Sequence, residues 1–339
     1  MDIRDIARLS GYGVGTVSRV LNGHPNVSER ARERVLAVVA EQGYEPNGNA
    51  RYLKLQAKTS IAVMVKGASN LLFADLLERI QARLEERGEE CHAVYLGEDE
   101  DEVREALSYS RTMHPKGYLF LGGDPACFKR GFSGIRVPSV LLTNSAAGFG
   151  FSNLSSFSTD DAAAAVDELV EAGHRRIGII GGNREIGQVS QIRIQAAVDR
   201  LAHHGISFDF DRDYEPGHYT MDEGYQAAVR LLMRTSDITA LFALSDVIAF
   251  GTLRAVCDMG RRVPDNISVA GFDGIELSQF CIPRLTTVRQ DTARLAALGV
   301  DTLLASIENR ATPPVHQHVP FTLYRRESVR RLTPSSRKG

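Results

Sequence analysis

A short segment near the start of the chain carries side chains suited to contacts with nucleic acid. Hydroxyl, guanidinium and amide groups stand close together there, at Thr16, Ser18, Arg19 and Asn22. Such groups bind phosphate oxygens and the major-groove edge of guanine. A helix face that contacts only solvent more often carries Glu and Lys, so this composition favours a surface that reads DNA.

The residues around this segment predict two helices joined by a tight turn. Helical spacing predicts a first helix over residues 2–9, with apolar side chains at Ile3, Ile6, Ala7 and Leu9. Gly11 follows, where a sharp turn needs a residue free to adopt positive φ. A second helix is expected from Val14 to Leu21, with its buried side at Val17, Val20 and Leu21. Because the small Ala7 permits close packing, the pattern indicates a helix-turn-helix.

A third helix is expected next, with Ser28 as N-cap, Glu29 in its first turn and Gly43 at its end. Its apolar side chains are Val35, Leu36 and Val39. An ordinary three-helix bundle would show the same spacing, but the polar face of the second helix favours DNA binding. Residues 1–58 hold nine Lys and Arg against six Asp and Glu, whereas the rest of the chain is acidic. A basic module of this kind fits a polyanion as partner.

Residues 14–54 resemble the DNA-binding headpiece of the lactose-repressor (LacI) family of bacterial transcription regulators. Their sequence is VGTVSRVLNGHPNVSERARERVLAVVAEQGYEPNGNARYLK. The resemblance implies that three residues read bases from the recognition helix, namely Val14, Gly15 and Arg19. It places three others near phosphates, namely Thr16, Ser18 and Asn22. Gly13 stands where the family usually has Ser, so a hydroxyl that caps the helix and contacts phosphate is missing.

Residues 46–58, PNGNARYLKLQAK, are expected to join the headpiece to the rest of the chain. Gly48 and Asn49 are poor helix formers, and the segment is too short for a stable helix in water. The resemblance implies a hinge helix that forms on DNA, pairs with its dimer mate and inserts Leu53 into the minor groove, with Ala50 at a matching position. Such a wedge unstacks a base step and bends the duplex. The alternative is a plain linker.

From Ile61 onward, short apolar runs alternate with amphipathic helices. The runs cover residues 61–65, 91–96, 118–123, 137–142, 177–182, 240–244 and 267–272. Runs of this length separated by helices indicate strands buried in parallel sheets, and the chain is long enough for two doubly wound lobes. Sheets of this kind bind ligands at the carboxyl ends of their strands.

Later segments extend the resemblance to about Leu332. They are AGHRRIGIIGG, ALFALSDVIAFGTLRAV, VPDNISVAGFDGIELSQF and PRLTTVRQD. These segments look like the effector-binding domain of the same family, which has the fold of periplasmic sugar-binding proteins. The resemblance implies two lobes joined by crossings near residues 160–161, 289–291 and 321–323.

The expected fold class is therefore α/β, with four parts. A small all-α helix-turn-helix headpiece occupies residues 1–45, and the hinge occupies residues 46–58. Residues 59–332 form a two-lobed, periplasmic-binding-protein-like, doubly wound domain for effector binding and dimerisation. Residues 333–339 form a disordered tail.

The cleft between such lobes would hold a small-molecule effector. By position in the family's pattern, the expected contacts are Leu72, Phe73, Asp160, Arg193, Tyr219, Ser245, Asp246 and Asp273. Carboxylates and a guanidinium fix hydroxyl groups, while an aromatic face covers the apolar side of a sugar ring. A sugar or glycoside is therefore favoured, with a purine or another metabolite as the alternative. For Arg193 and Asp273, a structural ion pair is the competing interpretation.

The sequence thus predicts a transcription regulator, and specifically a repressor, that binds a pseudo-palindromic operator in double-stranded DNA. A homodimer is expected over a tetramer, because no C-terminal heptad helix is present. No enzyme motif, cofactor or metal site is expected. The alternative is a stand-alone cytoplasmic sugar-binding protein. The first residues lack the apolar core of a secretion signal and no apolar run approaches the roughly 20 residues that cross a bilayer, so a cytoplasmic location without membrane contact is expected.

Other features predict no site. The cysteines form no CxxC pair and are expected as free thiols, mostly buried, at Cys91, Cys127, Cys257 and Cys281. The acidic run over residues 98–102 is expected at a solvated helix N-terminus. Two histidine pairs, 203–204 and 316/318, lack the further ligands that a metal needs.

Overall fold

The computed structural model divides into two compact units, Met1–Ala57 and Lys58–Gly339. It describes residues 3–21, 27–42, 60–67, 70–143, 150–155, 159–184, 189–309, 311 and 313–332. The expected phosphate contact Asn22, the hinge with Ala50 and Leu53, and the tail over residues 333–339 lie outside these residues.

The first unit contains the expected helix-turn-helix. α1 (Ile3–Ser10) and α2 (Val14–Leu21) are joined through Gly11, whose φ of 77° lies in the left-handed region. α3 (Glu29–Glu41) packs against both helices. Their shared core is formed by Ile6, Ala7, Val17, Val20, Val35 and Val38.

Some side chains of this unit differ from the sequence prediction. Leu9 of α1 is exposed, and Ile6 and Ala7 are the residues of that helix in the core. Leu36 is exposed because the buried stripe of α3 runs through Ala31, Val35 and Val38 at spacings of four and three residues. The Ser28 hydroxyl makes no capping hydrogen bond, and α3 ends with Gln42 as its C-cap, one residue before the expected Gly43.

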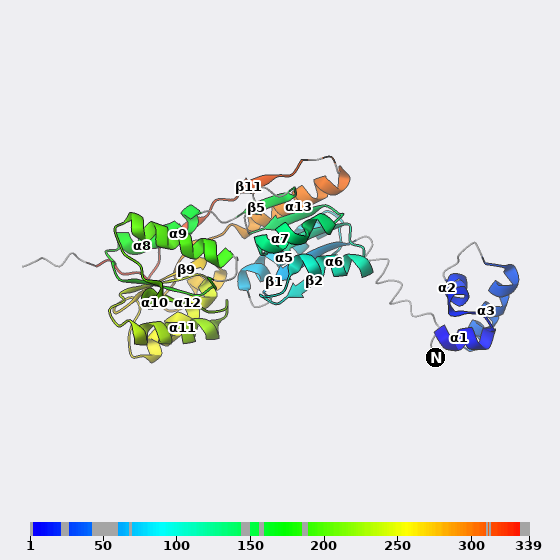
Figure 1. The fold of residues 1–339 in the computed structure, drawn as a ribbon, viewed down its shortest axis with the longest axis horizontal. Helices are drawn as coiled ribbons and strands as arrows, with labels where there is room; N and C mark the ends of the chain where they lie inside the picture. Colours follow the sequence, from blue (N-terminus) through cyan, green and yellow to red (C-terminus); the bar gives the residue numbers. More distant parts are fainter. Residues whose placement is uncertain are drawn as a thin grey trace, which may run out of the picture. The chain divides into compact units, whose positions relative to one another are not determined.

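The second unit contains two lobes, each with a sheet between helices (Figure 1). The sheet of the first lobe has the order β11-β5-β4-β3-β1-β2, and its strand pairs are parallel. Its strands are β1 (Ile61–Lys66), β2 (Cys91–Leu96), β3 (Gly117–Leu121), β4 (Ser139–Leu142), β5 (Ser152–Ser155) and β11 (His316–His318). α5 (Leu71–Glu86) and α13 (Thr292–Glu308) cover one face, and α6 (Glu102–Thr112) and α7 (Pro125–Gly131) cover the other.

The two faces explain the uninterrupted apolar run in β1. Ile61, Val63 and Val65 enter the core under α5 and α13, whereas Ala62 and Met64 enter the core under α6 and α7. Successive side chains of a strand point to opposite faces, so a strand covered on both sides is apolar throughout.

The sheet of the second lobe has the order β12-β10-β9-β8-β6-β7. Its strands are β6 (Ile177–Ile180), β7 (Tyr214–Glu215), β8 (Ala240–Ala243), β9 (Ser268–Asp273), β10 (Thr286–Arg289) and β12 (Thr322–Tyr324), of which β12 is antiparallel to β10. Its helices are α8 (Thr159–Glu171), α9 (Val189–His203), α10 (Phe210–Asp213), α11 (Met221–Arg234) and α12 (Asp246–Asp258). Short 3₁₀ turns lie at Phe132–Gly134 in the first lobe and at Glu276–Gln279 in the second.

The chain passes between the lobes close to where the sequence predicts. It leaves the first sheet after β5 and reaches α8 at residue 159, returns between β10 and α13 through residues 290–291, and passes again between β11 and β12. Strands β5, β7, β10, β11 and β12 are absent from the prediction, because each has only two to four residues and most carry polar side chains.

The cysteines differ from the expectation of mostly buried thiols. All are free; Cys127 is buried, Cys91 and Cys281 are half-buried, and Cys257 is exposed on the solvent side of α12. Within the described residues, no helix has both the length and the apolar character to span a bilayer.

Candidate functional site

One candidate surface lies on α2 of the first unit. Its buried side is formed by Val17 and Val20, which pack onto α1 and α3. On the other side Val14, Gly15 and Arg19 are exposed, and Thr16 and Ser18 are half-buried. The described residues expected to contact DNA are therefore accessible, and α2 can enter a major groove with a guanidinium and hydroxyl groups presented together.

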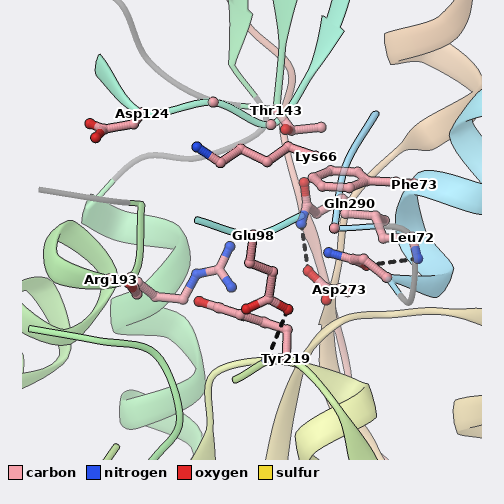
Figure 2. A pocket seen from close by; sticks show the side chains of 15 residues that line it. Lys66, Leu72, Phe73, Glu98, Asp124, Thr143, Arg193, Tyr219, Asp273 and Gln290 are labelled. Carbon is pink, nitrogen blue, oxygen red and sulfur yellow. Dashed lines mark hydrogen bonds between the residues drawn. The ribbon is translucent and has the colours of Figure 1, made fainter. Parts of the chain in front are cut away.

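A second candidate site is a cavity of about 100 Å³ between the lobes of the second unit (Figure 2). Its described lining is Lys66, Gly67, Asn70, Leu72, Phe73, Glu98, Gly122, Gly123, Asp124, Thr143, Ser190, Arg193, Tyr219, Asp273 and Gln290. Most of these residues end a strand or follow one closely. The cavity thus lies at the carboxyl ends of both sheets, where doubly wound folds bind ligands.

Asp273 ends β9 and presents its carboxylate to the cavity in an unusual backbone conformation. Its φ is 110°, a region that residues other than glycine rarely adopt. Oδ1 accepts a hydrogen bond from Gln290 Nε2 at 2.7 Å. Burial raises the pKa of Asp273 to about 6, against the lowering effects of Arg193 and Gln290.

Asp246, expected as an effector contact, instead supports the turn that carries Asp273. Its carboxylate is fully buried and accepts hydrogen bonds from Thr287 Oγ1 at 2.6 Å and from the Ile275 backbone N–H at 2.9 Å. These bonds join α12 to the segment after β9 and to β10. A Cβ at Gly271 would lie 2.4 Å from Asp246 Oδ1, so the glycine makes this approach possible. Burial, and then the Asp273 charge, raise the pKa of Asp246.

Ser245 and Asp160 also lie outside the cavity lining. Ser245 is the N-cap of α12, and its buried hydroxyl accepts a hydrogen bond from the Ile248 backbone N–H at 3.2 Å. Asp160 is exposed in the first turn of α8. Position after a strand or at a crossing therefore identified the region, but none of these three residues is part of the described cavity lining.

Arg193 reaches the cavity from α9 and is fixed by its surroundings. It lies three residues after Ser190, so both line the cavity from one face of the helix. Its Nη1 donates a hydrogen bond to the Leu244 carbonyl oxygen, and its guanidinium carbon lies 3.8 Å from the centre of the Phe272 ring. The side chain is therefore held in place, with its guanidinium directed into the cavity (Figure 2).

The first lobe contributes a charged wall. Lys66 Nζ forms an ion pair with Glu102 Oε2 at 2.7 Å, and Glu102 Oε1 accepts a hydrogen bond from the Asp124 backbone N–H at 2.6 Å. Burial raises the pKa of Glu102, although Lys66 opposes the shift. The expectation that the acidic run is wholly solvated is therefore wrong: α6 does begin at Glu102, but that carboxylate is buried, and Glu98 lines the cavity.

Apolar groups close another part of the cavity. Leu72 and Phe73 lie in the first turn of α5, after Asn70, whose side chain accepts a hydrogen bond from the Leu72 backbone N–H. Gly122 leaves room for Phe73, because a Cβ there would lie 2.9 Å from the Phe73 ring. The aromatic ring of Tyr219 lines the cavity from the second lobe, and its burial raises the pKa of its hydroxyl.

The structure thus brings together five expected residues, namely Leu72, Phe73, Arg193, Tyr219 and Asp273. The main polar residues that sequence reasoning missed are Lys66, Glu98, Asp124, Thr143 and Gln290. Lys66, Glu98, Asp124 and Thr143 end or soon follow predicted strands, so the rule that ligands bind at strand carboxyl ends points to their positions. Gln290 follows β10, which the sequence did not predict, so this rule could not have found it. The group can hydrogen-bond a polyhydroxylated molecule through several carboxylates, an ammonium and a guanidinium, with aromatic rings against its apolar faces.

A ligand-sized cavity between two parallel-sheet lobes, on a chain that also has a helix-turn-helix, defines a DNA-binding protein with a small-molecule domain. Residues 166–329 match the model of the periplasmic binding protein-like domain, and residues 2–47 match that of bacterial regulatory proteins, lacI family. The chain is 34% identical over 316 residues to the HTH-type transcriptional regulator MalR of Clostridium butyricum, covering 91% of this chain and 93% of that protein.

Solved structures agree over almost the whole chain. A complex of the transcriptional regulator CelR with cellobiose has a TM-score of 0.69 and 28% identity, covering 97% of this chain and 99% of that one. The lac repressor dimer bound to operator and the anti-inducer ONPF has a TM-score of 0.72 and 25% identity, with the same coverage. The chain belongs to the lacI family of bacterial regulatory proteins. It is a DNA-binding transcription regulator and not an enzyme.

Proposed function

We propose that this protein is a homodimeric repressor whose operator affinity is controlled by a sugar or glycoside bound in the cavity between its lobes. The observation that carries the proposal is the cavity itself, where Arg193 and Asp273 face Lys66 and Glu98 beside the rings of Phe73 and Tyr219. Carboxylates and cations that flank aromatic rings suit hydroxyl groups on a sugar ring better than the flat edge of a purine.

The cavity has room for a compact ligand. A site needs roughly 10–15 Å³ of such volume to hold one water molecule, and the cavity has about 100 Å³. A hollow of about 850 Å³ shares Leu72, Asp273 and Gln290 with it, so cavity size does not decide between a monosaccharide and a disaccharide. The similar regulator CelR has been solved with cellobiose, a disaccharide.

The DNA partner follows from α2. One recognition helix per chain and a symmetric dimer fit a pseudo-palindromic operator with two half-sites, and the similar lac repressor has been solved as a dimer bound to operator. Val14, Gly15 and Arg19 are proposed to read bases, with Thr16 and Ser18 near phosphates. We propose a cytoplasmic location, because a regulator that binds operator DNA must reach the bacterial chromosome.

Retention of genomic DNA fragments by the purified protein tests the proposal. We expect a small set of related pseudo-palindromes to be retained, and ribose, galactose, glucose, cellobiose, adenine and guanine are then tested for release of the retained DNA. Release by a sugar supports the proposal, and release by a nucleobase alone supports the purine alternative. Sugar binding without sequence-specific retention would indicate a stand-alone binding protein.

Arg19→Ala tests base reading directly. A guanidinium that binds a guanine edge contributes about 1–3 kcal/mol of discrimination, so affinity for the operator should fall while affinity for random DNA changes little. Arg8→Ala is the matched control, because Arg8 is an exposed arginine on α1 that pairs with Asp5. Equal losses on operator and random DNA would contradict the role of Arg19.

A further inference from the structure

One side chain joins the two lobes at the edge of the cavity. Glu98 follows β2 in the first lobe, and its Oε1 accepts a hydrogen bond from the Tyr219 backbone N–H of the second lobe at 3.3 Å. Its Oε2 lies 3.1 Å from His218 Nδ1. Figure 2 shows Glu98 reaching over the cavity toward Tyr219. Since Glu98 and Tyr219 both line the cavity, the lobes meet here at the rim of the ligand site.

The charges that face His218 favour its protonated form. Glu98 and Asp99 face it from the first lobe, and Glu223 faces it from α11. The nearby cation, Arg230 of α11, donates a hydrogen bond to Glu215 at 2.6 Å and so is engaged elsewhere. The hydrogen bond to Glu98 and these carboxylates raise the pKa of His218 above its ordinary value.

The lobes also meet through a contact of a different kind. Leu72 of the first lobe packs with Val247 and Ile275 of the second. This apolar contact carries no charge and does not respond to pH, whereas the contact through Glu98 pairs a carboxylate with an imidazole. Protonation of His218 therefore acts on the contact through Glu98 and leaves the apolar contact unchanged. A separate histidine–carboxylate pair also spans the lobes, because His318 Nε2 of β11 lies 3.8 Å from Asp161 Oδ1 of α8.

We propose that Glu98 and His218 form a proton-dependent latch that holds the two lobes together over the cavity. When His218 is protonated, the ion pair and the adjacent hydrogen bond to the Tyr219 amide hold this edge shut. When His218 loses its proton the attraction is lost, and the open state gains population. Because a histidine pKa that is raised in the closed state stabilises closure at low pH, closure weakens as pH rises through that pKa.

The latch couples proton binding to ligand binding. A molecule enclosed by both lobes is held more tightly in the closed state, so protonation of His218 and occupation of the cavity favour each other. The latch rests on the proposed function only for the identity of the molecule that occupies the cavity. The latch itself is a property of the ligand-free protein and is tested there.

Hydrogen exchange of the ligand-free, full-length protein tests the latch. Exchange of the peptide that contains residues 216–221 is followed from pH 5.5 to 8.5 and corrected for the intrinsic pH dependence of exchange. Half-exposed ion pairs are weak, so we expect protection of the Tyr219 amide to fall by about two- to fivefold across the range. His218→Gln keeps a donor but no titration, and Glu98→Gln removes the charge, so both variants should lose the pH response.

His204→Gln is the matched control. His204 Nε2 lies 2.6 Å from Asp167 Oδ1, but both residues belong to the second lobe, so this variant should keep the wild-type response. NMR titration of the imidazoles provides a second readout, in which Glu98→Gln should lower the pKa of His218. A wild-type protein without pH response at Tyr219, an unchanged pKa of His218 in Glu98→Gln, or an equal effect of His204→Gln would each overturn the latch. Because neither DNA nor sugar is present, the outcome is independent of the sugar panel.

Discussion

The two lobes build their halves of the cavity in different ways. In the second lobe, Arg193 is fixed by the Leu244 carbonyl and the Phe272 ring, and Asp273 is fixed by Gln290 and by the turn that Asp246 supports. In the first lobe, Lys66 is largely neutralised by Glu102, a partner behind the cavity wall.

This difference assigns the lobes different tasks. The second lobe presents a guanidinium and a carboxylate in fixed positions, and such preorganisation reduces the cost of ordering on binding. The first lobe presents a wall in which an ion pair already satisfies the main cation. We therefore expect polar recognition to depend mainly on the second lobe, and fold stability to depend more on the charges of the first.

The largest expected effect comes from Arg193→Ala and Asp273→Asn. Loss of a hydrogen bond to a charged group costs about 1.5–3 kcal/mol, or roughly 10- to 150-fold in affinity, so effector control of operator binding should be lost. Asn is chosen at position 273 because it tolerates positive φ better than Ala. Operator binding without effector should persist.

Titration of operator release by the effector measures this loss. Arg200→Ala is the control for Arg193, since Arg200 lies on the same helix and pairs with Asp167 at the surface. If both cavity variants respond at the normal effector concentration, the second lobe is not the main recognition wall.

A smaller effect is expected from Asp246→Asn. The amide can still accept one hydrogen bond but cannot accept from both the Ile275 N–H and the Thr287 hydroxyl, so the turn that carries Asp273 should loosen. We expect effector affinity to fall by about five- to tenfold, as for one lost hydrogen bond. Asp258→Asn, at an exposed pair with Arg254 on the same helix, should leave affinity unchanged, as calorimetric titration would show.

The pH dependence of effector binding provides a third comparison. With a pKa of about 6, Asp273 is mostly ionised at pH 7 and mostly protonated at pH 5. If ligand hydroxyls donate to the ionised carboxylate, affinity should fall by up to about tenfold as pH falls from 7 to 5. Asp273→Asn should remove this acid limb. If the effector affinity of this variant still falls as pH falls from 7 to 5, a group other than Asp273 is responsible for the pH dependence.

The smallest effect on effector affinity is expected at the first lobe, from Lys66→Met. Removal of one partner leaves Glu102 buried without its cation, which costs about 3–5 kcal/mol of stability, while effector affinity should fall only by about two- to fivefold. Chemical denaturation measures the first effect and titration the second. The double variant Lys66→Met with Glu102→Gln should recover most of the stability. A loss of affinity as large as that of Arg193→Ala would remove the distinction between the lobes.

The sequence predicted the elements better than the direction of side chains within them. The recognition helix was predicted well because α2 is local: eight consecutive residues set both its buried and its exposed side. The cavity combines strand ends that are far apart in sequence. A position after a strand places Asp246 near the cavity, but only the packed structure shows that its carboxylate turns toward the segment after β9.

Asp246 was predicted to contact the effector but does not line the cavity, whereas Lys66 lines the cavity but was not predicted. Lys66 ends an apolar run, and nothing local distinguishes a solvated lysine at a strand end from one that faces a cavity. Its partner Glu102 lies 36 residues later, inside a run of acidic residues that resembles a solvated helix start. Long-range pairing of this kind cannot be derived from the spacing of residues along the chain.

The place of α13 has a consequence for synthesis of the protein on the ribosome. This helix packs on the first sheet against α5, although it follows the strands of the second sheet up to β10 in sequence (Figure 1). Until residues 292–308 have emerged, the face that Leu295, Val300 and Leu303 cover stays open to water. The first lobe therefore begins early and is completed late, so a stalled chain that ends near residue 290 would expose apolar surface to chaperones.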